Sequence, residues 1–322
     1  MFDSVKLEKG MYHLANTTFA QALEAADPSE AYVGTPLAAL DAYERQLKRF
    51  DIHISGPECD CVEKFFTTTE SAVLFPEFVR RAVKQGMEES ILPELTATTS
   101  AVNSTCYKGF SVDESDGAYT ATTFEGGNLK VTTITEAAAP ITLDKYGRVI
   151  SASYEIVRRQ RLDSFAVALR AIGRKLAGAI AAKALAKLKE SVTAIDLAGA
   201  TLAYADLANL YGQFTDFDMT TVVASPKTVA AILAMEQMSD RVADEKGTVY
   251  LPFGAKLIKD ASISDTTMIG LAKDYALECV TGSDVLLETD QLIHCQLDRI
   301  AVSVRVGFVP LMRGAVAVVD WT

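Results

Sequence analysis

Apolar residues recur every three or four positions between Asp163 and Ser191, the longest regular pattern in the chain. The stripe consists of Phe165, Leu169, Ile172, Leu176, Ile180, Ala184 and Leu188. This period predicts one α-helix, because residues three and four positions apart share a helix face. The segment has no proline and is rich in the helix formers Ala, Leu, Lys and Arg. At about 1.5 Å per residue, we expect a rod of roughly 43 Å.

Shorter periodic patterns predict further helices on both sides of this rod. They span residues 36–50, 76–89, 202–214 and 225–238. Pro76 suits a first helical position, and Ser225 followed by Pro226 forms a clear helix start.

Between residues 101 and 154 the pattern changes to a strand-rich texture of Thr, Val, Ile and Tyr. The dipeptides Asp116-Gly117, Gly126-Gly127 and Tyr146-Gly147 mark turns. A long two-stranded ribbon of this composition is marginally stable alone in water. We therefore expect it to need a neighbour, in this chain or in another copy.

More strands are predicted in the C-terminal part of the chain. They cover residues 219–225, 249–257, 266–272, 284–288 and 300–309, and a closing strand within 314–322 ends at the single Trp321. Helices and strands in this order predict an α+β fold with a mixed sheet.

Residues 1–71 are predicted to form an arm rather than a domain. They combine one short helix with turn-rich flanks around Pro28, Gly34, Gly56 and Pro57. Large apolar residues are too few here for a separate core. We expect this arm to become ordered by lying across something else.

Composition and charge narrow the class of protein. The chain has 322 residues, 49% hydrophobic residues and a net charge of −11, which indicates a globular protein and argues against general nucleic-acid binding. No apolar run approaches the length of a membrane span. The N-terminus lacks the pattern of an export signal, so the five cysteines are expected to be reduced thiols in a cytoplasmic setting.

Basic residues concentrate along the predicted rod. Residues 155–190 hold nine Lys or Arg against three Asp or Glu. A solvated helix face is one interpretation of this strip. A surface facing nucleic acid or another subunit is the other.

Motifs for catalysis or cofactor binding are not recognisable. The sequence contains no P-loop, no G-x-G-x-x-G and no G-x-S-x-G. Cys59 and Cys61 with His53 nearby do not have the spacing of a zinc site, and His294 beside Cys295 would point to the opposite face of a strand. We expect no catalytic, cofactor or metal site, although a soluble α+β enzyme with an unrecognised pocket is an alternative.

Three stretches together resemble the major capsid proteins of tailed bacteriophages, whose shell fold is shared with encapsulins. They are residues 124–180 (FEGGNLKVTTITEAAAPITLDKYGRVISASYEIVRRQRLDSFAVALRAIGRKLAGAI), 222–237 (VVASPKTVAAILAMEQ) and 305–321 (RVGFVPLMRGAVAVVDW). Within the first, Glu125-Gly126, the strand with Ser151 and Ser153, and Asp163 before the helix match the family pattern. The resemblance covers about residues 73–321.

This resemblance implies the tailed-phage shell fold. Its expected parts are an N-terminal arm (1–71), the start of a peripheral domain (72–110), an extended β loop (111–148), the peripheral domain with a long spine helix (149–195), an α/β axial domain (196–273), and peripheral strands with a closing axial strand (274–322). Copies of the chain would assemble through hexamers and pentamers into an icosahedral shell around double-stranded DNA. The shell would form in the host bacterial cytoplasm as part of the virion.

The same resemblance implies partners and interface residues. The extended loop would lie on a neighbouring copy through Phe124, Glu125, Lys130, Thr133, Thr135 and Lys145. The basic spine strip would consist of Arg158, Arg161, Arg170, Arg174, Lys183 and Lys187. We expect this strip to pair with a neighbour's acidic arm rather than with DNA, which would be touched only weakly. Scaffold, portal and decoration proteins are further expected partners, and an encapsulin-type compartment with protein cargo is the alternative function.

Overall fold

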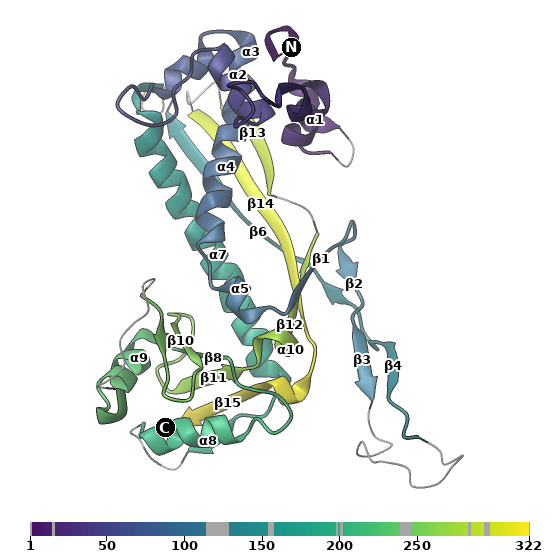
Figure 1. The fold of residues 1–322 in the computed structure, drawn as a ribbon, viewed down its shortest axis with the longest axis vertical. Coiled ribbons are helices and arrows are strands. Elements are labelled where there is room, and N and C mark those ends of the chain that lie inside the picture. The colour runs from purple at the N-terminus through teal and green to yellow at the C-terminus, as the bar shows by residue number, and fades with distance from the viewer. Residues whose placement is uncertain are drawn as a thin grey trace. The chain divides into compact units, whose positions relative to one another are not determined.

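The computed structural model describes residues 2–14, 17–113, 129–153, 158–197, 199, 202–238, 247–282, 285–292 and 297–321. The chain forms two compact units. Unit 1 comprises residues 1–89, 147–177 and 285–303, and unit 2 comprises residues 90–146, 178–284 and 304–322. Helices and strands mix in both units, so the predicted α+β class is confirmed (Figure 1).

Unit 1 is built from helices packed with part of a five-stranded sheet. Its helices are α1 (Phe19–Ala26), α2 (Ala42–Arg49), α3 (Thr69–Ala72), α4 (Phe75–Glu88) and the first part of α7 (Leu162–Ser191). Short 3₁₀ turns η1 (Phe2–Ser4), η2 (Lys9–His13), η3 (Ser29–Tyr32) and η4 (Val62–Phe66) connect them. In its sheet, β13 (Leu286–Leu292) pairs with the first half of β14 (Leu297–Pro310), and β14 also pairs with β6 (Asp144–Ser153).

Helices α4 and α7 approach each other backbone to backbone. A Cβ atom added to Gly86 would collide with the carbonyl oxygen of Arg170, and one added to Gly173 would collide with that of Val83. Only glycine allows this approach at both positions. The predictions for these helices, 76–89 and 163–191, agree with the structure within one residue at each end.

Residues 2–71, the N-terminal lobe, differ from the predicted arm. Their apolar side chains share one buried cluster with the rest of unit 1; its members include Leu7, Phe19, Leu23, Tyr43, Leu47, Phe65, Phe78, Val83, Leu162 and Leu169. The lobe is therefore packed against its own chain. Helix α2 is also shorter than predicted, because Asp41 caps it through a reciprocal bond with Glu44 and excludes residues 36–40.

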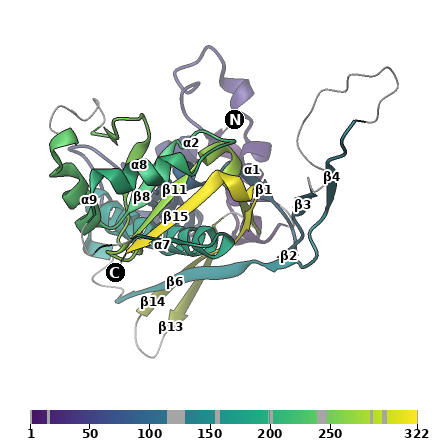
Figure 2. The same ribbon diagram turned by 90° about the horizontal axis from the view of Figure 1, so that it is seen from below.

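Unit 2 contains a mixed sheet flanked by helices (Figure 2). The strands lie in the order β7 (Ile195–Leu197), β15 (Val316–Trp321), β11 (Thr267–Leu271), β8 (Thr221–Ala224), β10 (Lys256–Lys259) and β9 (Val249–Tyr250). Helices α8 (Tyr204–Gly212) and α9 (Pro226–Leu233) contribute Leu207, Leu210 and Ile232 to its core. The turns η5 (Glu236–Met238) and η7 (Arg313–Ala315) also belong to this unit.

Some predicted elements of unit 2 have different bounds. The predicted strand 249–257 is wrong: it is a hairpin of β9 and β10 that turns at Gly254, whose φ is +93°. Several short elements, α10 (Lys273–Ala276) and β12 (Leu277–Thr281) among them, were not predicted. Helix α9 ends five residues before the predicted 238, where a 3₁₀ turn follows.

A two-stranded ribbon leaves the part of a five-stranded sheet that belongs to unit 2 (Figures 1 and 2). In that sheet β12 lies between β1 (Thr98–Ala101) and the second half of β14, and a short helix, α5 (Leu92–Leu95), precedes β1. The ribbon pairs β2 (Cys106–Tyr107) with β5 (Ile141–Thr142), and then β3 (Phe110–Asp113) with β4 (Thr133–Glu136). The predicted turn at Tyr146-Gly147 is wrong, since both residues lie inside β6. The other two turn dipeptides lie outside the described residues.

Within the described residues, no helix combines the length and the apolar character needed to cross a membrane.

Candidate functional site

The residues predicted for a subunit interface fall on and beside the ribbon. Thr133 and Thr135 are exposed on β4, Lys130 is exposed just before that strand, and Lys145 is exposed at the start of β6. The remaining two predicted residues, Phe124 and Glu125, lie outside the described residues.

One face of the ribbon carries three apolar side chains, beside Glu136, which lies opposite Phe110 and forms an ion pair with Lys108 at 2.9 Å. Val112 lies directly opposite Ile134 in the antiparallel register, and Phe110 lies two residues away on the same face. We call these three side chains the ribbon apolar face. Ile134 is 68% exposed and Phe110 is 41% exposed. The predicted residues Thr133 and Thr135 lie on the opposite face of the ribbon, and their role in a subunit interface stays a prediction.

Apolar packing holds the root of the ribbon. Leu143, Val280 and Val309 are buried together, with the half-buried Tyr107 and Ile141 packed against them. Two glycines allow this contact. A Cβ on Gly109 would lie 2.8 Å from Val309 Cγ1, and one on Gly307 would lie 2.8 Å from Ile141 Cδ1.

Polar contacts also tie the ribbon root to unit 2. The Oε1 atom of Glu278 in β12 accepts hydrogen bonds from Ser100 Oγ (2.5 Å) and Tyr107 OH (3.1 Å). Loss of solvent and this bond to the carboxylate raise the pKa of Tyr107. On the returning strand, Asp144 Oδ2 lies 3.2 Å from Lys183 Nζ of α7.

A hollow of about 310 Å³ lies beside this ion pair. Its lining comes from β5 and the residue before it, from the start of β6, from α7 and from β14. It consists of Pro140, Ile141, Thr142, Asp144, Lys183, Lys187, Val306, Gly307 and Phe308. Lys187 bonds to Glu190 at 2.6 Å, which lowers the pKa of that carboxyl group. Both lysines at the hollow therefore already have carboxylate partners.

The predicted basic spine strip is largely paired within the chain. Arg161 binds Asp163 at 2.9 Å, and this contact lowers the pKa of the Asp163 carboxyl group. Arg174 lies 3.7 Å from Glu89. Arg158 stacks over the Phe66 ring, 5.2 Å from its centre, and Arg170 is half-buried. The predicted pairing with a neighbour's acidic arm stays a prediction.

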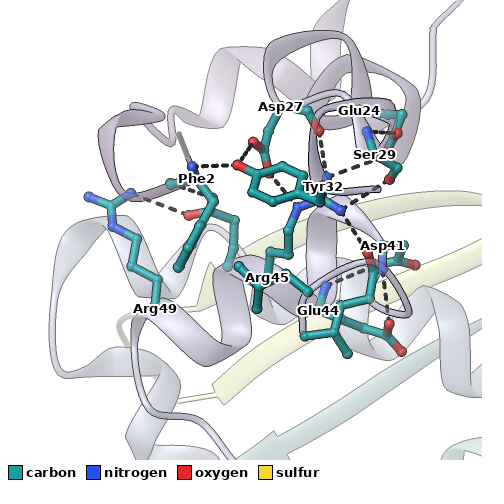
Figure 3. A network of polar contacts seen from close by, with 12 residues as sticks. Phe2, Glu24, Asp27, Ser29, Tyr32, Asp41, Glu44, Arg45 and Arg49 are labelled. Atoms are coloured by element: carbon teal, nitrogen blue, oxygen red, sulfur yellow. Dashed lines mark hydrogen bonds and ion pairs between the residues drawn. The ribbon is translucent and has the colours of Figure 1, made fainter. Parts of the chain in front are cut away.

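The N-terminal lobe has a buried charged network, which the sequence analysis did not anticipate (Figure 3). The Arg45 side chain is 0% exposed and donates from Nε to Asp27 Oδ2 (2.7 Å). Its other nitrogens donate to the carbonyl oxygens of Asp27 and Leu40 (2.6 Å each) and to Ser29 Oγ (3.1 Å). The guanidinium also lies 4.3 Å from the centre of the Tyr32 ring, whose hydroxyl donates to Asp27 Oδ1 (2.6 Å).

The same network fixes the first residues of the lobe. Phe2 N donates to Tyr32 OH at 2.8 Å, and Gln46 Nε2 donates to Phe2 O at 2.8 Å. Tyr12 joins the lobe to α4, since its hydroxyl donates to Val73 O (2.7 Å) and accepts from Glu77 N (3.1 Å). Burial raises the pKa of Tyr12.

The described cysteines and histidines do not form a metal centre. Among the described residues, no group of three or more His, Cys, Asp or Glu side chains is placed to hold a metal ion. Cys59 Sγ accepts a hydrogen bond from Asp163 N at 3.3 Å, at the start of α7. Burial raises the pKa of the Cys279 thiol to about 11. His294 and Cys295 lie outside the described residues.

Solved structures similar to this chain are shells of several kinds. A virus-like particle from Pyrococcus furiosus has a TM-score of 0.55 and 15% identity, and the match covers 76% of this chain and 98% of that one. The capsid of cyanophage P-SCSP1u has a TM-score of 0.52 and 14% identity, with 72% and 88% covered. The SrpI encapsulin complex from Synechococcus elongatus PCC 7942 has a TM-score of 0.53 and 12% identity, with 71% and 86% covered.

These likenesses confirm the predicted shell fold, which phage capsids and encapsulins share. No curated protein matches the chain in sequence. A profile of the family described as phage capsid protein matches residues 136–319, more than half of the chain. The protein therefore belongs to the phage capsid protein family and is a structural capsid protein.

Proposed function

We propose that copies of this chain assemble into a closed icosahedral shell that encloses the double-stranded DNA genome of a tailed phage. Membership of the phage capsid protein family and the shell fold support this proposal. Hexamers and pentamers of the chain are the expected building blocks. Scaffold, portal and decoration proteins are its expected further partners during assembly.

The ribbon apolar face is the observation that carries the proposal. A two-stranded ribbon is marginally stable by itself, and this one leaves Ile134 and Phe110 largely exposed. A neighbouring copy that covers this face would bury both side chains, together with Val112. Burial of a large aliphatic side chain is worth about 1.5–3 kcal/mol, and every subunit of a closed shell repeats the contact.

The proposed domain roles follow the order of the chain. Residues 72–110 and 149–195, with the later peripheral strands, form a peripheral domain. Residues 196–273 with the final strand form an axial domain near the centre of each hexamer or pentamer. The extended loop, residues 111–148, reaches the neighbouring copy. The N-terminal lobe is packed on its own chain, and we propose that its outer surface contacts the neighbour.

A compartment with protein cargo is the second candidate function. It is supported by the likeness to the SrpI encapsulin complex, which has the same shell fold with a TM-score of 0.53. Both candidates predict a shell, and they differ in its contents.

Electron microscopy of the purified full chain tests the proposal. We expect closed particles of megadalton mass, which sedimentation velocity measures independently. A chain that stays monomeric, with and without a co-expressed scaffold, would contradict shell formation. Particles isolated from phage-producing cells distinguish the two candidates: nuclease-resistant DNA inside supports the virion, whereas a co-purifying enzyme without DNA supports the compartment.

A further inference from the structure

Glu278 is buried in unit 2 with half of its carboxylate unpaired. Its exposed fraction is 4%. Oε1 accepts the two hydroxyl bonds from Ser100 and Tyr107. Oε2 is also buried, and no hydrogen-bond partner for it exists among the described residues.

Such a group destabilises the folded chain. A buried polar atom without a hydrogen bond loses its hydration and gains nothing in return. A well-packed apolar residue at a buried ionic position is often neutral or stabilising. Adjacent positions of the root are apolar, since Val280 and Val309 are buried there. Stability of the sheet alone therefore does not explain a glutamate at residue 278.

The partners of Glu278 indicate another role. Tyr107 belongs to β2, the outgoing strand of the ribbon, whereas Ser100 and Glu278 belong to the sheet. Apolar packing at the root is non-directional and tolerates small rotations. Hydrogen bonds weaken steeply away from linear geometry. The bond from Tyr107 therefore restricts the direction in which the ribbon leaves the sheet.

We propose that Glu278 is a positioning residue that sets the direction of the ribbon, at a loss of stability to the isolated chain. The proposal rests on the proposed function, because direction matters only if the ribbon must meet a neighbouring copy. A ribbon held in one direction loses less conformational entropy when the contact forms, which favours association.

Distance measurements on the dissociated full chain test ribbon direction. Spin labels carried by unnatural amino acids at the exposed positions Thr135 and Lys259, both in unit 2, report the distance between β4 of the ribbon and β10 of the six-stranded sheet. We expect a narrow distribution in the parent and a clearly broader one in Glu278→Leu and Tyr107→Phe. Particle formation by both variants should require about tenfold more protein, while the melting temperature of Glu278→Leu stays within about 2 °C of the parent or rises.

Two control variants separate positioning from stability. Thr281→Val removes another side-chain bond between the same two strands, from Thr281 Oγ1 to Ser100 O (3.3 Å), without touching the ribbon. It should leave the distance distribution unchanged. Glu278→Gln keeps an acceptor oxygen for Tyr107. It should therefore show the narrow distance distribution and the particle formation of the parent.

The inference about Glu278 and the proposed function can be contradicted independently of each other. If Glu278→Leu lowers the melting temperature well below that of Thr281→Val and leaves the distance distribution narrow, Glu278 is a structural residue and the inference is wrong. If the parent chain forms no particles, the proposed function fails, and the distance distribution alone still decides whether Glu278 directs the ribbon.

Discussion

The N-terminal lobe buries charged side chains, whereas the ribbon exposes apolar ones. In the lobe, Arg45 is 0% exposed and surrounded by acceptors from its own chain. In the ribbon, Ile134 is 68% exposed although its strand is regular and paired. Each segment thus departs from the usual distribution of polar and apolar residues, in opposite directions.

The two segments differ in whether their side chains find partners within the described part of the chain. The charged groups of the lobe find their partners within unit 1, so the lobe needs nothing further for its fold. The ribbon apolar face has an intact backbone ladder and no cover among the described residues. Regular secondary structure with an uncovered apolar face is typical of a surface meant for a partner.

Removal of one partner from the lobe network should have the largest effect. Asp27→Ala removes the hydrogen-bonded carboxylate of the buried Arg45 guanidinium and leaves only Glu24, at 3.8 Å, which should lower the free energy of unfolding by about 3–5 kcal/mol. Asp27→Asn keeps acceptor capacity and should lower it by only about 1–2 kcal/mol. Denaturant unfolding of the dissociated chain measures both. Equal losses in the two variants would mean that the charge of Asp27 is unimportant.

The ribbon should respond in assembly and not in folding. Ile134→Ser should change the free energy of unfolding of the dissociated chain by no more than about 0.5 kcal/mol. The same variant should weaken each ribbon contact by about 1.5–3 kcal/mol, which sedimentation of particles against free chain measures. Thr133→Ser on the polar face is the matched control and should assemble normally. A ribbon that belongs to a self-sufficient subunit would instead show normal assembly for both.

Acidification should loosen the lobe by a small amount. Hydrogen bonds from Ser29, and then the charge of Arg45, lower the pKa of Glu24 from its ordinary value of 4.5. A lowered folded-state pKa stabilises the lobe above pH 4.5, and this contribution disappears as the pH falls through the lower folded value. Amide exchange in α1 between pH 6 and pH 3 should reveal it. In Glu24→Gln this part of the pH dependence should be absent.

Long periodic elements were predictable from the sequence because local pattern and tertiary burial agree there. The stripe from Phe165 to Leu188 gave α7 within one residue at each end. The closing strand ending at Trp321 is β15 in the structure. In both cases one face or the whole strand is buried, so hydrophobicity carries the necessary information.

The N-terminal lobe and the ribbon apolar face were not predicted, because the hydrophobic pattern alone determines neither of them. Apolar residues alone suggested too small a core for residues 1–71, while much of their order comes from polar bonds between distant positions such as Arg45 and Asp27. On β4 the interface prediction named Thr133 and Thr135, and it stays a prediction, because composition does not tell which face of an isolated ribbon is covered. The β9–β10 hairpin was missed because Gly254 interrupts an otherwise strand-like run.

The glycine contacts between α4 and α7 have a consequence for force transmission. Gly86 faces the Arg170 carbonyl and Gly173 faces the Val83 carbonyl, so two separate points fix the register of one helix along the other. A shift by even one residue would bring a side chain against a peptide group at both points. Within unit 1, helices α4 and α7 should therefore resist sliding along each other under mechanical load until one of them unwinds.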